Sequence, residues 1–114
     1  MFCHIIELQA RPGKAPDICA AIRDHTVPEV VERFQGFRHE IVLVADDDPD
    51  HVTAISMWDS KASADAFYQG GFEQVSAMLV QLLQAKPARR DCDVAVWTGP
   101  AARQLQGART AASD

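Results

Sequence analysis

Histidine and tyrosine are the side chains in this sequence best suited to moving or holding a proton near neutral pH. His25 follows Ile18 and Ile22 at helical spacing, so we expect its ring to point toward a cleft between that helix and a sheet. A neutral imidazole there could act as a general base. Tyr68 follows Phe67 in a short predicted helix, and its hydroxyl could anchor a substrate. His25 and Tyr68 are therefore the candidate catalytic residues. Two simpler readings stay open, a helix histidine bonded to a neighbour or water and a half-exposed tyrosine.

Large apolar side chains mark the elements that would surround such a cleft. Trp58 stands where a predicted strand meets a predicted helix, and Phe67 lies in that helix. Together with Ile22 they are the candidate substrate-pocket residues, although core packing is the alternative for Trp58. Trp97 lies in the last predicted strand. We expect it to anchor an interface between two copies of the chain, because buried tryptophans often do so.

Metal and nucleotide sites are not indicated. The histidines share no H-x-x-x-H or Cys/His ligand spacing; they are His4, His25, His39 and His51. The acidic run 46–50 lacks the glycine and glutamate of a calcium loop, so a solvated hairpin tip is expected. Gly70-Gly71 reads as a helix breaker, since no G-x-G-x-x-G follows a strand. We predict no metal and no cofactor.

Composition limits the class of partner. The chain has 114 residues, of which 47% are hydrophobic and 24% charged, as expected for one globular domain. A net charge of -5 argues against nucleic acid or an anionic membrane as partner. No apolar run approaches the roughly 20 residues of a membrane span. Three cysteines without C-x-x-C spacing (Cys3, Cys19 and Cys92) and an N-terminus unlike an export signal predict free thiols and a cytoplasmic location.

Several elements must position these residues. Residues 2–9 read as a strand, and 15–34 as a helix that kinks or restarts at Pro28, where the apolar stripe changes phase. Residues 37–45 and 51–58 form a predicted hairpin, with Ala45 opposite His51 and Arg38 opposite Trp58. Asp59 or Ser60 should cap a short helix that ends at Gln69. A helix over 72–83, a strand over 91–98 and a loosely ordered tail over 99–114 complete the chain, so residues 1–98 form one domain.

The order β-α-β-β-α-α-β predicts an α+β, ferredoxin-like fold with a four-stranded antiparallel sheet. Helices in this plan cover one face of the sheet, yet both faces of the predicted strands are apolar. Ile41 and Ile55 point to one side, whereas Val42 and Ala54 point to the other. An uncovered apolar face usually marks an interface. We therefore predict a homodimer that packs sheet against sheet.

Residues 4–85 resemble the antibiotic biosynthesis monooxygenase domain of the dimeric α/β-barrel superfamily. The matching pieces are Arg-Pro-Gly-Lys at 11–14, Phe-Gln-Gly-Phe-Arg at 34–38, the acidic Asp-Pro hairpin, and Ser-Met-Trp-Asp-Ser-Lys-Ala at 56–62 followed by Phe67. The resemblance implies a dimeric α/β barrel. It also implies oxidation of small electron-rich aromatic or quinol-like compounds by O₂, often without metal or flavin.

The chain departs from the residue patterns of two branches of that family. The heme-degrading branch uses an Asn, a Trp and a His. This sequence contains no Asn, carries Phe67 at the Trp position, and has Ser76 at or beside the His position. Heme degradation is therefore not expected, and the Asn-dependent polyketide-oxidising branch matches less well. Two hypotheses follow, a cofactor-independent monooxygenase or oxidase, and a non-catalytic dimer that binds a small aromatic ligand. Heme binding without degradation is a third possibility.

Overall fold

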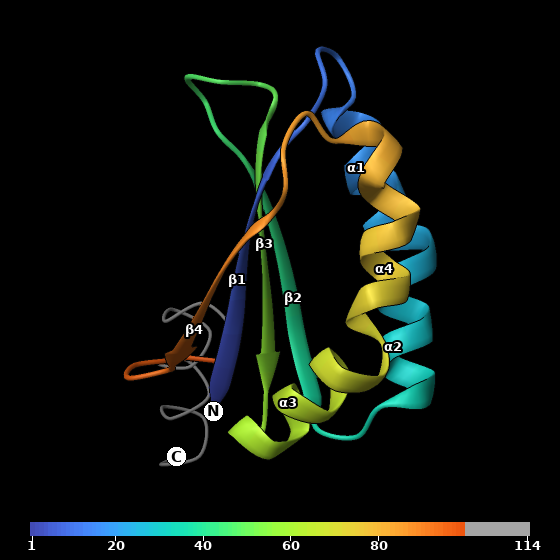
Figure 1. Cartoon of the computed structure of the whole chain (residues 1–114). Coiled ribbons are helices and arrows are strands. Elements are labelled where there is room, and N and C mark those ends of the chain that lie inside the picture. Colours follow the sequence, from blue (N-terminus) through green and yellow to red (C-terminus); the bar gives the residue numbers. More distant parts are fainter. Residues whose placement is uncertain (100–114) are drawn as a thin grey trace, which may run out of the picture.

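The computed structural model describes residues 1–99 (Figure 1). The elements follow in the order β1 (Phe2–Gln9), α1 (Ala15–Ala21), π-helical η1 (Ile22–Thr26), α2 (Val27–Arg33), β2 (Phe37–Val44), β3 (His51–Trp58), α3 (Lys61–Gly70), α4 (Phe72–Leu79), 3-10 helical η2 (Val80–Leu82) and β4 (Ala88–Asp93). The predicted tail over 99–114 lies, apart from Gly99, outside the described residues.

One antiparallel sheet forms the first layer, with strand order β2-β3-β1-β4. The helices form the second layer and all lie on one face of the sheet (Figure 1). The predicted α+β, ferredoxin-like architecture with a four-stranded antiparallel sheet is confirmed. Every helix among residues 1–99 is too short or too polar to span a membrane.

The sequence suggested that the first helix kinks or restarts at Pro28. In the structure a wider turn, η1, precedes the proline, and the α-helix begins again at Val27 with Pro28 in the first turn of α2. Proline lacks an N–H, and its ring clashes with the carbonyl four residues earlier in an α-helix. A π turn relieves this clash, and the Val27 N–H bonds to the carbonyl of Ile22. Consequently the buried positions become Ile18, Ile22, Thr26 and Val30, four residues apart.

The hairpin of β2 and β3 also differs from the expected register at one end. Val44 lies opposite Val52, and Ala45 donates its N–H to the carbonyl of His51, as predicted. At the other end Phe37, not Arg38, lies opposite Trp58, because a β-bulge falls between Phe37 and His39. A bulge inserts one unpaired residue and reverses the facing of residues beyond it.

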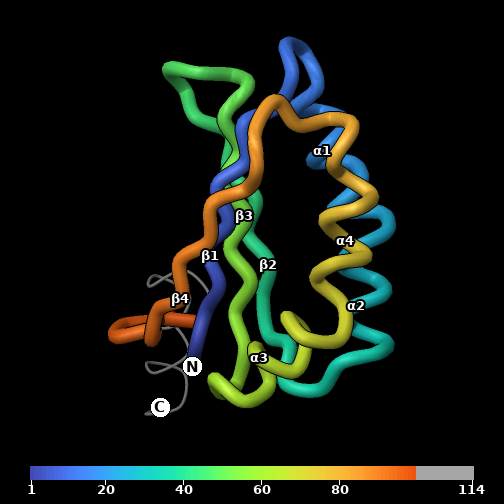
Figure 2. Tube along the Cα trace, in the orientation of Figure 1, coloured from blue at the N-terminus to red at the C-terminus, as the bar shows by residue number. Residues whose placement is uncertain are grey.

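The last strand is shorter and earlier than the predicted 91–98. It pairs with β1 from Ala88 opposite Glu7 to Asp93 opposite Phe2. Val94 donates one more hydrogen bond, to the carbonyl of Met1, and β1 then offers no further partner. The chain therefore turns sharply after β4, as its orange part shows in Figure 2. Trp97 lies beyond the strand.

Glycine and serine fix the junctions that bring α3 onto the sheet. Gly36 has a φ of 85° and ends the α2–β2 turn, and its carbonyl accepts the N–H of Asp59. Ser60 caps α3, because its hydroxyl oxygen accepts the N–H of Ser63 at 3.1 Å. α3 continues one residue past the predicted Gln69, to Gly70. Two apolar clusters form the core, one under α1 and η2 and one around Trp58 and Phe67.

Candidate functional site

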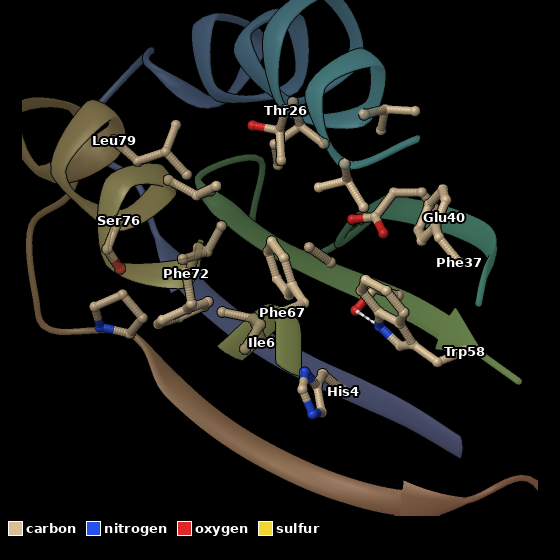
Figure 3. A pocket seen from close by; sticks show the side chains of 18 of the residues that line it. His4, Ile6, Thr26, Phe37, Glu40, Trp58, Phe67, Phe72, Ser76 and Leu79 are labelled. Carbon is tan, nitrogen blue, oxygen red and sulfur yellow. Dashed lines mark hydrogen bonds between the residues drawn. The ribbon is translucent and has the colours of Figure 1, made fainter. Parts of the chain in front are cut away.

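A cavity of about 60 Å³ lies between the helices and the inner face of the sheet (Figure 3). Its walls come from both core clusters and are mostly aliphatic and aromatic, as is usual for small-molecule sites. The lining residues are His4, Ile6, Leu8, Ile22, Thr26, Val27, Val30, Phe37, Glu40, Ala54, Ser56, Trp58, Phe67, Phe72, Val75, Ser76, Leu79, Leu83 and Pro87.

A row of polar residues crosses the sheet beneath this cavity. Ser56 on β3 lies directly opposite Glu40 on β2 and His4 on β1, and His4 in turn lies opposite Asp91 on β4. Directly opposed residues of antiparallel strands point to the same face, with Cβ atoms about 4.5–5.5 Å apart. Glu40, Ser56 and His4 all line the cavity, so three polar groups stand side by side on an otherwise apolar floor.

Glu40 is the acidic member of this row. Its side chain is half-buried and points from β2 toward the cavity (Figure 3). Burial alone raises the pKa of its carboxyl from 4.5 to about 8, because removal from water disfavours the charged form. The bulge places Glu40 on the same face as Phe37, although the two residues are three apart in sequence.

His4 is almost completely buried, with 1% of its surface exposed. Burial, then the nearby Arg89 guanidinium, lowers its pKa, so the ring is neutral at pH 7. Arg89 binds Asp91 through two hydrogen bonds of 2.7 Å. Arg89 Nη2 also lies 3.5 Å from Nε2 of His4, and Asp91 Oδ1 lies 3.7 Å from the same nitrogen. Because a guanidinium can only donate, the contact with Arg89 favours the tautomer in which Nε2 accepts and Nδ1 carries the proton. His4 thus offers an N–H on its other side.

Trp58 closes the floor beside this row. It is fully buried, and its indole N–H donates to the Ser56 hydroxyl oxygen at 3.3 Å. Its ring stacks on Phe67 with centroids 5.3 Å apart and meets Phe37 edge-on at 5.4 Å. These contacts fix the aromatic wall and orient Ser56, whose own O–H remains available to donate.

Thr26 provides a buried hydroxyl on the helical wall. Its side chain is 8% exposed, and its Oγ1 has no hydrogen-bond partner among the described residues. Such an unsatisfied group costs about 1–3 kcal/mol in the absence of a partner. The Thr26 hydroxyl is therefore open to a hydrogen bond with a ligand.

The structure brings three of the predicted site residues together at the cavity. Ile22, Trp58 and Phe67 all line it, although substrate binding there stays a prediction. The predicted orientation of His25 is wrong, because the wider π turn gives the inward position to Thr26 and leaves His25 exposed. A base at the cavity has to come from another residue.

Tyr68 lies outside the cavity lining and is 40% exposed. The Arg89 guanidinium lies over its ring, 3.4 Å from the ring centroid, and the ring stacks on that of Phe72 with centroids 4.9 Å apart. It also meets His4 edge-on at 6.1 Å. Tyr68 therefore covers the Arg89–His4 end of the site from outside. Its catalytic role stays a prediction.

Sequence reasoning missed His4, Glu40 and Thr26. A signal existed for two of them, since His4 and Glu40 interrupt strands whose neighbours on the inner face are apolar. The predicted hairpin register already places Glu40 opposite Ser56, but only the pairing of β1 with β3 shows that His4 lies opposite Ser56 as well. Thr26 could not be found, because a π turn has no clear sequence signature. Among residues 1–99, no group of three or more metal-binding side chains is close enough to hold an ion.

An open groove of about 630 Å³ lies on the outside of β2 and reaches the cavity wall. The two share Ile22, Val27, Phe37 and Glu40. The groove also has basic and aromatic residues, Arg23, Arg38, His39 and Trp97. Glu40 is the polar residue that lines both spaces and therefore lies between the groove and the cavity.

The family model described as antibiotic biosynthesis monooxygenase matches residues 1–71. No curated protein matches the sequence. Solved structures similar to this chain include a protein of Nitrosomonas europaea assigned to the antibiotic biosynthesis monooxygenases (TM-score 0.69, 13% identity, covering 84% of this chain and 100% of that one). Another, from Chloroflexus aurantiacus and assigned to the same group, has a TM-score of 0.59 and 19% identity, covering 87% and 100%. Rv0793 from Mycobacterium tuberculosis has a TM-score of 0.68 and 14% identity, covering 86% and 98%. At such identities the likeness establishes the fold alone.

Proposed function

Because the chain belongs to the antibiotic biosynthesis monooxygenase family, we propose that it is a cofactor-independent monooxygenase or oxidase. Its substrate would be a small electron-rich aromatic or quinol-like metabolite, and its oxidant O₂. The observation that supports this most is the cavity itself, an apolar, aromatic-walled space with a short row of polar groups on its floor. Catalysis of this kind needs proton handling and exclusion of water, and the site combines the two.

The chemistry follows from the substrate class. A deprotonated arenol or quinol is a far better electron donor than its neutral form, so it can pass an electron to O₂ directly. The protein then needs a base, hydrogen-bond donors for the anion, and apolar walls. Trp58 and Phe67 would pack against the ring, and Ile22 would contact it from the helical side.

A ring needs more room than the cavity offers. An engineered cavity that encloses benzene in another protein measures about 150 Å³, against about 60 Å³ here. We propose that substrate enters from the groove along β2, where shifts of the shared Phe37 and Val27 side chains would join the two spaces. The β2 edge strand has no neighbour on that side within the sheet.

We also propose that the chain forms a homodimer through the outer face of the sheet. Ile5, Ile55 and Ile41 lie side by side across β1, β3 and β2 on this face, which carries no helix (Figure 1). Leu43 is 49% exposed beyond them. Trp97 packs on His39 at 5.1 Å between ring centroids and remains 39% exposed, so it would lie at the margin of such an interface.

Oxygen consumption tests the enzymatic proposal. Metal-free protein is mixed with a hydroquinone or an anthrone, and O₂ uptake is followed with an electrode. We expect uptake above the buffer rate, and a reduced rate in Tyr68→Phe if its hydroxyl takes part. His25→Ala should react like wild type, given the exposed position of His25. Rates equal to buffer for every compound would contradict the proposal.

The alternative is a dimer that binds a small aromatic ligand without turnover, and the lack of any Asn in the chain favours it. It predicts that the same compounds raise the melting temperature while no O₂ is consumed. Titration with heme covers the third possibility, since binding would shift the Soret band.

A further inference from the structure

We propose that Glu40 is the general base of this site and accepts the proton of the substrate's aromatic hydroxyl, while Ser56 donates a hydrogen bond to the oxyanion that forms and His4 donates one to an oxygen at the far end of the ring. This inference deepens the proposed function and rests on it for the later oxygen step. It names as substrate a neutral arenol, which carries no carboxylate.

Glu40 lies where a substrate hydroxyl would enter the site. Glu40, Ser56 and His4 are consecutive members of one row across β2, β3 and β1, and all three line the cavity. Glu40 also lines the groove, so a hydroxyl that enters from β2 meets it first. The far end of the row is about two strand spacings away, roughly 10 Å. An aromatic ring lying along the row would thus reach from Glu40 toward His4.

No side chain that the structure describes competes for the Glu40 carboxylate. Glu40 forms no hydrogen bond or ion pair with any side chain of residues 1–99. The charged and titratable groups around it belong to other interactions. Arg38, on its own strand, binds Asp59, and Arg23, on the helical wall, binds Asp24 at 2.8 Å. Cys19 and His39 line the groove, and His4 is the other titratable group of the cavity.

The proton affinity of Glu40 suits a general base for an aromatic hydroxyl. A carboxylate whose pKa is near 8 is a much stronger base than one at 4.5, and its affinity lies nearer to that of a phenol. In the step, the Glu40 carboxylate takes the hydroxyl proton, so that a carboxylic acid and an arenolate replace a carboxylate and an arenol. The net charge in the cavity stays at -1, and no second charge has to be created in an apolar space.

Donors for the substrate oxygens lie in the same row. The Ser56 oxygen already accepts from Trp58, which leaves its O–H to donate. The contact from Arg89 favours a His4 proton on Nδ1, the nitrogen not facing β4. The open hydroxyl of Thr26 adds a further polar contact from the helical wall. With no cation lining the cavity, a substrate carboxylate would find no charged partner there and would be repelled by ionised Glu40.

The test compares wild type with Glu40→Gln, which has the same shape but cannot accept a proton. Glu7→Gln is the matched control, because Glu7 is a strand carboxylate on the opposite face of the sheet, bonded to Thr53 and His51. The wild-type rate of O₂ uptake with a hydroquinone should rise through about pH 8. Glu40→Gln should be at least about 100-fold slower and independent of pH in this range, as for loss of a general base. Glu7→Gln should match wild type.

A binding measurement separates this inference from the proposed function. The probe is 4-nitrophenol, whose phenol and phenolate forms differ in visible absorption. At a pH where both Glu40 and the free probe are ionised, wild type and Glu7→Gln should take up a proton when they bind the probe as phenolate, because the Glu40 carboxylate must be neutralised. Glu40→Gln, whose neutral amide stands in for the protonated acid, should bind the phenolate at least as tightly but without proton uptake. Equal proton uptake or equal rates in Glu40→Gln would overturn the role of Glu40 even if O₂ is consumed. Proton uptake that depends on Glu40, without any O₂ uptake, would instead support the base and contradict the oxygenase.

Discussion

At the scale of single residues, the cavity contains polar groups whose charge or hydrogen-bonding capacity is not compensated by a neighbour. Glu40 is an acid in apolar surroundings, and Thr26 is a hydroxyl with no partner among the described residues. Ordinary cores avoid both, because each costs stability. Proteins accept such costs mainly at functional sites. Two measurements of stability can therefore locate the site without knowledge of the substrate.

The first measurement uses pH. Since the folded state raises the pKa of Glu40 from 4.5 to about 8, it binds the proton more tightly than the unfolded state. The free energy of unfolding should consequently fall as pH rises between about 4.5 and 8, by a few kcal/mol at most. Urea unfolding of wild type and Glu40→Gln across this range should show a steeper decline in wild type. Parallel profiles would mean that Glu40 titrates normally when folded.

The second measurement uses Thr26→Val, which keeps the shape and removes the unpartnered hydroxyl. We expect the ligand-free variant to be as stable as wild type or more stable by about 1 kcal/mol. It should also bind an arenol more weakly. A loss of more than about 1 kcal/mol in thermal unfolding would indicate that the hydroxyl has a partner in the free protein.

At the scale of elements, one π turn and one β-bulge position the residues of the site. The π turn of η1 brings Thr26 rather than His25 to the cavity, and the bulge in β2 puts Phe37 and Glu40 on one face. Each irregularity inserts one extra residue into a regular element. The insertion changes which side chain points inward, while the element itself stays in place.

A substitution at Gly36 tests the junction between these elements and α3. Its φ of 85° is unfavourable for other residues, and an added Cβ would collide with the Ser63 side chain. Gly36→Ala should cost more than the roughly 1–2 kcal/mol of the left-handed conformation alone. Gly13→Ala is the control, with a φ of 77° and open space around it. Chemical denaturation should show the larger loss at Gly36, and adding Ser63→Gly should recover the difference.

At the scale of the whole molecule, one face of the sheet is covered by helices and the other is not. The segment after β4 crosses one end of the outer face, from the Val94–Met1 hydrogen bond to the Trp97–His39 contact. The central row of three isoleucines lies beyond it. Burying such side chains contributes about 1.5–3 kcal/mol each, which is enough to favour association.

The proposed dimer can be tested at the middle of this row. Ile55→Asp would place a charge between Ile5 and Ile41 and should give a monomer in light scattering at concentrations where wild type is a dimer. Val31→Glu is the control, because Val31 lies 62% exposed on the helical side. A wild-type protein that stays monomeric at high concentration would exclude the sheet-to-sheet dimer.

The sequence by itself determined the order of elements, the antiparallel sheet with helices on one face, the capping of α3 and the family. These depend on local patterns of apolar spacing, caps and turn residues, which neighbours in the chain decide. The tertiary structure decided that His4 joins Glu40 and Ser56, which the hairpin register had already placed opposite each other. His4 and Ser56 are 52 residues apart along the sequence, and Glu40 and Ser56 are 16 apart. His25 was misplaced for a different reason, because the wide helical turn before Pro28 gives the inward position to Thr26 and leaves His25 exposed.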